Sequence, residues 1–461
     1  MRPLSLTEVA GFAEAHLRGP QRAGQPVLRV QTDSRAIRAG DLFVCLRGEH
    51  FDGHDFADAA CAAGAAALLV QRPLPVELAQ LEVADTVQAL GRLAAGVARS
   101  RTTRVFGLTG SNGKTTVKTL LAGIVERVGS AWANPGNFNN EIGMPLSLLN
   151  QPEDAEYAVY EMGAGAPGDI EWLARIARPR YSLVNNIGPA HLERMGSLLG
   201  IAETKGAIYR ELPADGVAVI NADDAFAPLF AQMAGARRQL RFGLDNDADV
   251  YAERLQPTES GSRFRLCTPA GGLDLHLPLP GRHSVMNALA AASLAVAAGI
   301  DLVQIGEGLE AAQGVAGRFQ ARAHASGAEI IDDSYNANPG SVRAAIDTLA
   351  AGGTAAWLVL GDMRELGPDA ERLHAEVGAH ARAQGLAGVF TVGALAAAAS
   401  RAFGEGGQHF DTQESLADAL RPRLAPGLRV LVKGSRGSRM ERVVAALFDG
   451  QGTSPGGAHA A

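Results

Sequence analysis

The sequence predicts an α/β protein built from three domains, and three observations lead to this prediction. The chain has 461 residues, which is too long for a single hydrophobic core and enough for about three domains of ordinary size. Short apolar segments alternate with helical patterns, which is typical of parallel, doubly wound sheets. Alanine and glycine are frequent while aromatic residues make up only 5%, so helices can pack closely on sheets.

Residues 1–100 are expected to form a small N-terminal α/β domain. Strands are predicted at Leu42–Leu46 and Ala66–Val70, and alanine-rich helical periodicity covers Thr86–Ala98. The polar stretch Ser100–Arg104 interrupts this pattern, and we place the first domain boundary there.

Residues 101–315 are expected to form a central domain around a parallel sheet. A glycine-rich turn leads from its first strand into a helix that runs from about Lys114 to Val128. Antiparallel strands are expected within Tyr251–Leu279. The predicted strands of the parallel sheet are Val105–Thr109, Ala158–Met162, Tyr181–Asn186 and Val217–Asn221.

Residues 316–449 are expected to form a C-terminal Rossmann-like domain without the dinucleotide-binding GxGxxG pattern. Residues 450–461 are rich in glycine, serine, proline and alanine, and this tail is expected to be disordered. The predicted strands of the domain are Ala328–Tyr335, Ala356–Met363, Gly388–Gly393 and Arg429–Ser435.

Composition and charge argue against several classes of function. A net charge of −7 argues against a nucleic-acid-binding protein. Three widely spaced cysteines give neither a disulfide framework nor a zinc pattern, and fit a reducing cytosol. The N-terminus lacks the features of a signal peptide, and the most apolar stretch, Ala288–Ile300, is too short for a membrane span. We expect a cytoplasmic monomer without a membrane span.

The strongest local signal is the segment GLTGSNGKTT, Gly107 to Thr116. A glycine-rich turn between a strand and a helix lets backbone N–H groups surround phosphates. Lys114 would then reach the β- and γ-phosphates, and the hydroxyl of Thr115 could hold Mg²⁺. Leu108 stands where the generic motif has a glycine. The residues expected to bind ATP or GTP here are Thr109, Gly110, Ser111, Asn112, Gly113, Lys114, Thr115 and Thr116.

Three further side chains are candidates for metal binding and catalysis. Glu161 and His191 each follow or end a buried strand, where a side chain faces the crevice of a parallel sheet. Taken alone, Glu161 also suits a solvated loop and His191 a hydrogen-bonded polar position. Lys205 taken alone would be an exposed helix lysine.

The nucleotide loop, preceded by its strand, is similar to that of the Mur ligases and of their relative folylpolyglutamate synthase, and the resemblance continues in order down to the tail. It implies a ligase that uses ATP and Mg²⁺ and forms an acyl phosphate, which an amine then attacks. It also implies that Thr115, Glu161 and His191 bind the metal. It implies further that Lys205 is carbamylated by CO₂, which would give an anion that helps to hold Mg²⁺.

The resemblance extends to the joint with the third domain. Asn287 matches a residue on the adenine side of the nucleotide, and Arg318 matches an arginine that reaches the phosphates and joins Lys114 among the catalytic groups. Asp333 matches an aspartate beside the nucleotide, with Tyr335 and Asn338 in the same loop. A helix cap at Asn287, a salt bridge at Arg318 and a structural turn at Asp333 are the alternatives.

Two segments resemble the family members that add D-alanyl-D-alanine to a UDP-MurNAc-tripeptide. Thr32–Phe56 is similar to a UDP-sugar-binding segment, and Asn134–Leu149 is close to the GNxNNxIGxPL signature, with Glu141 as a departure. Strand ends near Gly361–Gly367 supply a further acid. The residues expected to bind the organic substrates are Ser34, Arg35, Asn137, Asn139, Asn140, Lys433 and Arg436.

Other functions stay open at this point. A ligase for the third amino acid would carry a DNPR-type loop, which the sequence lacks. A folylpolyglutamate synthase would not need the long N-terminal domain. A P-loop ATPase switch or motor would leave Lys205 unexplained, and a noncatalytic UDP-sugar-binding protein would not need Lys114, Glu161 and His191.

Overall fold

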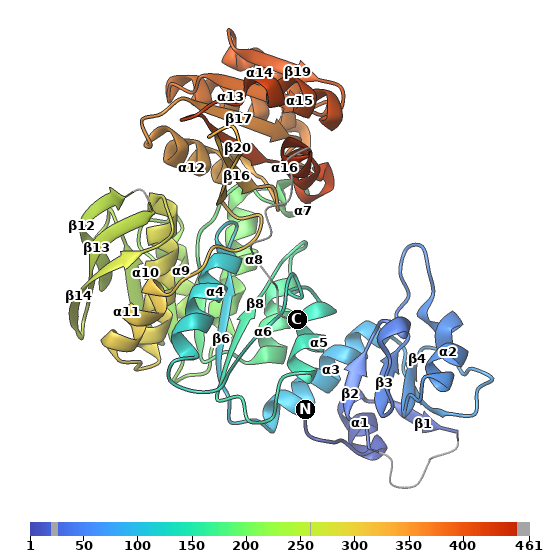
Figure 1. The fold of residues 1–461 in the computed structure, drawn as a ribbon. Coiled ribbons are helices and arrows are strands. Elements are labelled where there is room, and N and C mark those ends of the chain that lie inside the picture. Colours follow the sequence, from blue (N-terminus) through green and yellow to red (C-terminus); the bar gives the residue numbers. More distant parts are fainter. Residues whose placement is uncertain (20–25, 259, 450–461) are drawn as a thin grey trace.

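The computed structural model describes residues 1–19, 26–258 and 260–449, and these residues form three sheets with helices packed on them (Figure 1). The mixed α/β class with parallel sheets, predicted from the sequence, is confirmed. The predicted disordered tail, 450–461, lies outside the described residues. Within the described ranges, no helix is both long and apolar enough to cross a membrane.

The first sheet belongs to the N-terminal part of the chain. Its order is β1-β5-β4-β3-β2, and every neighbouring pair is parallel except β1 with β5. Helix α1 begins at a capping box made by Ser5 and Glu8. The elements are α1 (Leu6–Ala13), β1 (His16–Arg18), β2 (Arg29–Gln31), η1 (Ser34–Ala36), β3 (Asp41–Val44), η2 (Gly53–Phe56), α2 (Ala57–Ala62), β4 (Ala67–Val70), β5 (Ala79–Glu82) and α3 (Thr86–Arg99).

The second sheet has nine strands in the order β14-β13-β12-β11-β10-β9-β6-β8-β7. The pairs from β7 to β12 are parallel, and β12, β13 and β14 are antiparallel. The strands are β6 (Arg104–Thr109), β7 (Ala131–Ala133), β8 (Tyr157–Glu161), β9 (Tyr181–Val184), β10 (Val217–Asn221), β11 (Arg238–Gly243), β12 (Val250–Thr258), β13 (Gly261–Thr268) and β14 (Gly271–Leu277). The helices are α4 (Lys114–Val125), α5 (Gly143–Leu149), α6 (Asp169–Ala177), α7 (Leu192–Met195), α8 (Leu198–Arg210), α9 (Ala227–Ala234), α10 (Arg282–Ala297) and α11 (Leu302–Glu310).

Strand β6 is the point at which the chain direction across this sheet reverses. The chain runs from β6 to β7 and β8 on one side, and then to β9 on the other. The register sets Glu161 beside Leu108 and Val184 beside Thr109, so three strands end at the same edge. Open α/β sheets bind ligands in the crevice at such a switch point.

The third sheet has the order β15-β16-β20-β17-β18-β19, and only the pair of β15 with β16 is antiparallel. Its strands are β15 (Gln320–Ala323), β16 (Glu329–Asp333), β17 (Ala356–Gly361), β18 (Gly388–Val392), β19 (Gly407–Phe410) and β20 (Arg429–Lys433). Its helices are α12 (Pro339–Ala350), η3 (Gly367–Asp369), α13 (Ala370–Ala383), α14 (Ala397–Phe403), α15 (Gln413–Leu420), η4 (Arg421–Arg423), η5 (Arg436–Ser438) and α16 (Glu441–Phe448).

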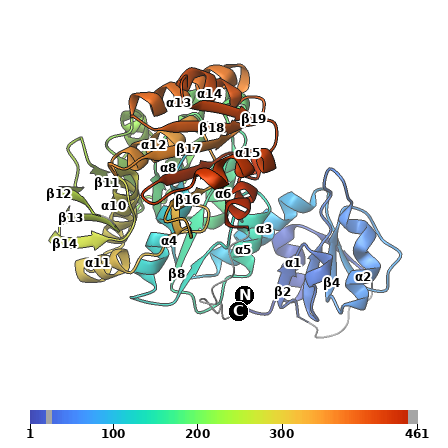
Figure 2. The ribbon, with the colours of Figure 1, turned by 45° about the horizontal axis from the view of Figure 1, so that its top comes forward.

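The three units, each defined by one sheet and its helices, are joined in different ways. One hydrophobic cluster runs from the first unit into the second, where α3 packs on α5 and α6. The ring of Trp172 lies against Gly91, where a Cβ atom would leave no room. Among the described residues, the hydrophobic clusters of the third unit contain residues of that unit alone. Figures 1 and 2 show this unit (orange to red) lying over the second, with the first unit (blue) to one side.

The sequence predicted the buried strands better than the edge strands. The bounds of β10 are those predicted, while α4 ends at Val125 instead of Val128. β15 was not predicted, because all four of its residues are exposed and it contains no large apolar or β-branched residue.

Candidate active site

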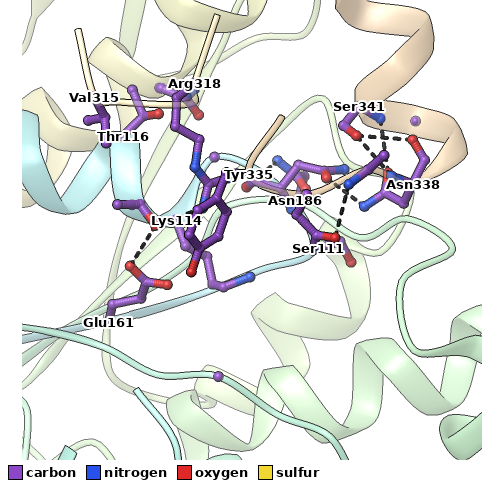
Figure 3. Close-up of a pocket in the computed structure, with 18 of the residues that line it drawn as sticks. Ser111, Lys114, Thr116, Glu161, Asn186, Val315, Arg318, Tyr335, Asn338 and Ser341 are labelled. Carbon is purple, nitrogen blue, oxygen red and sulfur yellow. Dashed lines mark hydrogen bonds between the residues drawn. The ribbon is translucent and has the colours of Figure 1, made fainter. Parts of the chain in front are cut away.

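One large cavity, of about 590 Å³, lies between the second and third units. Its walls come from the loop after β6, the segment between β7 and α5, the ends of β8 and β16, and the start of α10. The size is in the range of pockets that hold nucleotides and other small molecules. It lies at the switch point of the second sheet, and Figure 3 shows the side chains that meet there.

The loop after β6 has the geometry of a phosphate-binding turn. Gly110 and Gly113 have φ angles of 145° and 77°, which favour glycine, and α4 starts directly after Gly113 without a side-chain cap. The backbone N–H of Asn112 donates to Oδ1 of Asn186 (2.9 Å), and Oγ of Ser111 donates to the carbonyl of Gly188 (3.0 Å). The segment after β9 therefore braces the loop.

Lys114 extends back along this loop. Its Nζ donates to the carbonyl oxygen of Gly110 at 2.8 Å. Burial lowers the pKa of Lys114, nearby Glu161 opposes this shift, and the positive charge of Arg318 adds to it. The ammonium group thus lies at the mouth of the loop, where an anionic phosphate would compensate its charge.

Glu161, at the end of β8, accepts hydrogen bonds from side chains of the nucleotide-loop helix α4 and of the segment before α5. Its side chain is only 4% exposed. The hydroxyl of Thr115 donates to Oε2 (3.0 Å), and Nδ2 of Asn139 donates to Oε1 (2.8 Å). Nζ of Lys118 lies 3.5 Å from Oε2 and donates to the carbonyl of Asn134 (2.8 Å).

Lys118 is a functional candidate that the sequence reasoning missed. It lies one helical turn after Lys114, and residues spaced by four share a face of a helix. That spacing was the available signal. Because its ammonium contacts both Glu161 and the carbonyl of Gly136 (3.1 Å), Lys118 ties the carboxylate to the asparagine-rich loop before α5.

His191 lies at the start of α7 and faces the third unit. Its φ of 57° is left-handed, which is unusual for a residue other than glycine. Nδ1 lies 2.5 Å from Oε2 of Glu365. Burial lowers the pKa of His191, Glu365 opposes the shift, and Lys205 and Lys114 add to it.

Lys205 is buried, unlike the exposed helix lysine that its local sequence suggested. It lies on α8, lines the cavity and is only 1% exposed. Burial lowers its pKa well below the usual range, Lys114 lowers it further, and Asp169 acts in the opposite direction. Within residues 1–19, 26–258 and 260–449, no hydrogen bond or ion pair reaches its Nζ.

Arg318 reaches into the second unit from the start of the third. Its Nη2 donates to Oγ1 of Thr115 (3.2 Å), and its guanidinium lies over the ring of Tyr335, 4.1 Å from the centroid. Figure 3 shows the two side chains stacked above Lys114 and Glu161. A planar guanidinium held in this way suits bidentate contact with phosphate.

Asn338 forms a second bridge between the units. Its Nδ2 donates to Oδ1 of Asn112 in the nucleotide loop (2.7 Å), and its Oδ1 accepts from the backbone N–H of Ser341 at the start of α12. One side chain therefore both caps α12 and holds the loop, as Figure 3 shows.

Asp333 and Lys433 form a buried ion pair at neighbouring strand ends. Nζ of Lys433 lies 2.7 Å from Oδ2 of Asp333 and donates to the carbonyl of Asn336 (2.9 Å). Burial lowers the pKa of Lys433, although Asp333 opposes the shift. Arg436 also lines the cavity, with its guanidinium 5.9 Å from the centroid of the Tyr335 ring.

The structure gathers most, but not all, of the residues that the sequence singled out. Thr109 and Gly110 are not among the residues that line the cavity, and Thr109 is fully buried. Ser34 and Arg35 lie in η1 of the first unit, outside this cavity, and Arg35 pairs with Asp33 (2.8 Å). Their role in binding a UDP-sugar stays a prediction. The predicted residues that line the cavity are Ser111, Asn112, Gly113, Lys114, Thr115, Thr116, Asn137, Asn139, Asn140, Glu161, His191, Lys205, Asn287, Arg318, Asp333, Tyr335, Asn338, Lys433 and Arg436.

The donors around the cavity fit Mg²⁺ rather than a metal held by the protein alone. The described part of the chain contains no cluster of three or more His, Cys, Asp and Glu side chains that could hold a metal ion. Magnesium is commonly held by one or two carboxylates together with substrate phosphates and water. Thr115, in the first turn of α4, donates a hydrogen bond to Glu161 at the end of β8, and the two side chains offer such a partial set of oxygen ligands.

The fold and the cavity together are those of a nucleotide-binding ligase in which residues of the second and third units line one cavity. Models of the Mur ligase family match the chain in three stretches: the family's catalytic domain at residues 27–97, its middle domain at 108–295 and its glutamate ligase domain at 317–436. The chain belongs to the Mur ligase family.

Curated relatives named UDP-N-acetylmuramoyl-tripeptide–D-alanyl-D-alanine ligase are similar over their whole length. The Escherichia coli relative is 43% identical over 450 residues, covering 97% of this chain and 99% of the relative. The Bacillus subtilis relative is 35% identical over 457 residues, with 96% and 98% covered.

Solved structures agree with this assignment. The chain matches MurF from Acinetobacter baumannii with a TM-score of 0.92 and 34% identity, covering 97% of this chain and 99% of that one. MurF ligase from Thermotoga maritima in complex with ADP matches with a TM-score of 0.82 and 30% identity, covering 92% and 97%. A folylpolyglutamate synthase of Mycobacterium tuberculosis, at 18% identity and a TM-score of 0.62, shares the fold alone.

Proposed function

We propose that this protein is the ligase that joins D-alanyl-D-alanine to UDP-N-acetylmuramoyl-tripeptide, with ATP converted to ADP and phosphate. The observation that carries the proposal is the single cavity in which the nucleotide loop, Glu161 and the asparagine-rich loop before α5 meet. Relatives that are similar over their full length carry the name of this activity. The product is the UDP-linked pentapeptide of peptidoglycan synthesis.

The chemistry needs an anion to approach an anion. The terminal carboxylate of the tripeptide attacks the γ-phosphorus of ATP, ADP leaves, and an acyl phosphate forms. Lys114 and Arg318 lie where their positive charges offset this repulsion. The neutral amine of D-alanyl-D-alanine then attacks the acyl carbon, the tetrahedral intermediate loses phosphate, and a proton is released as the amide forms. This mechanism requires no protein nucleophile.

Magnesium would be held by Thr115, Glu161 and His191 together with the phosphates of ATP. When bound, it screens the negative charges of phosphate and carboxylate. Glu161 is held for this role by Thr115, Asn139 and Lys118, which fix both carboxylate oxygens.

We propose further that Lys205 becomes carbamylated and contributes an anion to this site. Only a neutral amine attacks CO₂, and burial favours the neutral form of Lys205, whose Nζ has no hydrogen-bond or ion-pair partner among the described residues. Incubation with ¹³C-bicarbonate should give a carbamate signal in the ¹³C spectrum. The signal should disappear in Lys205→Ala and persist in Lys118→Met, which removes another buried lysine; a signal that persists in Lys205→Ala contradicts the assignment.

The three units divide the work. We assign residues 1–100 to binding of the UDP-sugar, through Ser34 and Arg35, residues 101–315 to ATP and residues 316–449 to closing the nucleotide site. ATP and UDP-linked precursors are cytoplasmic metabolites, and we place the reaction in the cytoplasm.

Phosphate release tests the proposed reaction. The complete mixture contains ATP, Mg²⁺, UDP-MurNAc-tripeptide and D-alanyl-D-alanine, and one component is omitted at a time. Release should require both organic substrates, and the product should be heavier than the tripeptide precursor by one dipeptide residue. Release that continues without the dipeptide would indicate an ATPase switch instead of a ligase.

A further inference from the structure

Glu365 comes from the third unit but contacts a functional residue of the second. Its Oε2 lies 2.5 Å from Nδ1 of His191, and its backbone carbonyl accepts a hydrogen bond from the N–H of Glu193 (3.4 Å). Helix α7, which begins directly after His191, packs against η3, which follows Glu365. Both side-chain and backbone contacts therefore join these two segments across the interface.

The two residues are held in unusual backbone conformations. Glu365 and His191 have φ angles of 62° and 57°, in the left-handed region that residues other than glycine seldom adopt. Strain of this kind persists only where surrounding contacts enforce it, and it is concentrated at functional sites.

The loop that carries Glu365 is held within the third unit by the residues before and after Glu365. The N–H of Met363 donates to Nε2 of the buried His374 (2.8 Å), and the N–H of Arg364 donates to Oγ of Ser435 (2.8 Å). Leu366, directly after Glu365, is buried in the third unit's own core. The side chain of Glu365 thus projects from a rigid support.

The contact with Glu365 bears on which ring nitrogen of His191 carries the proton. A carboxylate at Nδ1 keeps the proton on that nitrogen, so Nε2 carries the lone pair. Histidine ligands of metals are commonly oriented in this way by a carboxylate or carbonyl on the other nitrogen. His191 lines the cavity that also contains Thr115 and Glu161.

We propose that Glu365 is a positioning residue which fixes the imidazole of His191 with Nε2 towards the cavity, so that the metal-binding site is complete only when the third unit is seated on the second. The proposal rests on the proposed role of His191 as a metal ligand. A simple surface ion pair is the competing explanation, because both side chains are partly exposed and such pairs stabilise little.

Manganese bound to the full-length protein with ADP separates these explanations. Imidazole coordination gives a ¹⁴N signal in the pulsed electron paramagnetic resonance spectrum of Mn²⁺, and Mn²⁺ affinity is measured in the same samples. Glu365→Ala should weaken Mn²⁺ binding by about 10- to 100-fold and reduce the ¹⁴N signal. Glu365→Gln should retain part of both, because its amide oxygen can still accept from Nδ1. Glu371→Ala, which removes an exposed ion pair with Arg401 in the same unit, is the matched control.

The outcomes distinguish the two levels of the argument. If His191→Ala keeps the ¹⁴N signal, His191 is not the ligand and its proposed role fails. If His191→Ala loses the signal while Glu365→Ala keeps wild-type affinity and signal, the positioning role of Glu365 is overturned. Loss in both alanine variants, with partial recovery in Glu365→Gln and none lost in Glu371→Ala, supports the proposal.

Discussion

Replacing Gly113 by alanine probes the packing that shapes the nucleotide loop. Gly113 has a φ of 77°, and a Cβ atom there would lie 2.2 Å from Oδ1 of Asn287 and 2.6 Å from Nδ2 of Asn185. Those two atoms form a buried hydrogen bond with each other (2.9 Å). The added methyl group must therefore disrupt this bond or move the loop.

The free-energy cost of Gly113→Ala has two parts, one from the backbone conformation and one from the broken hydrogen bond, and a control variant separates them. A left-handed backbone costs a residue other than glycine about 1–2 kcal/mol. Breaking the buried bond between Asn185 and Asn287 costs about 1–3 kcal/mol more. Gly299→Ala is the matched control, because Gly299 has the same φ of 77° and no atom of the described residues lies within 4 Å of its Cβ position. It should show the backbone cost alone.

Calorimetric binding of ADP and thermal unfolding measure the two effects. If ADP binding requires the wild-type shape of the loop, the free energy of the broken hydrogen bond reduces the affinity. Gly113→Ala should then bind ADP about 5- to 150-fold more weakly. Gly299→Ala should bind as the wild type does. Equal unfolding temperatures and equal ADP affinities for both variants would refute the argument that Asn185 and Asn287 shape the loop.

Three further predictions concern the third unit. Burial lowers the pKa of His374, so this residue is protonated in the unfolded chain before it is protonated in the folded protein as the pH falls below about 6.5. The free energy of unfolding should therefore decrease by at most about 1.4 kcal/mol per pH unit. Urea titrations at pH 7.5 and 5.5 should show a smaller decrease in His374→Gln than in the wild type, and an equal decrease would contradict a contribution from His374. Lys433→Met should cost about 3–5 kcal/mol in urea unfolding because it leaves the carboxylate of Asp333 buried and unpaired, and adding Asp333→Asn should recover much of that loss. Asn338→Ala should lower stability by about 0.5–2 kcal/mol through the lost helix cap, whereas Asn338→Ser should keep the cap but lose the contact with Asn112; similar ADP affinities for Asn338→Ser and the wild type would show that this contact does not shape the nucleotide site.

The sequence determined the features that consecutive residues encode. The strand, glycine turn and helix around Lys114 and Thr115 lie within one short segment, so their geometry follows from local backbone preferences. Buried strands such as β10 were predicted because an uninterrupted apolar run must be covered on both faces. The edge strand β15 escaped prediction because its exposed residues carry no such pattern.

Only the tertiary structure decided how side chains from distant segments meet. The burial of Lys205, the stacking of Arg318 on Tyr335 and the contact of Glu365 with His191 depend on how the units pack. No periodicity along the chain records such packing, because each contact joins residues whose local sequences would be equally compatible with exposed positions. The position of Lys118 beside Glu161 also depends on how α4 packs on β8, which no local sequence pattern records.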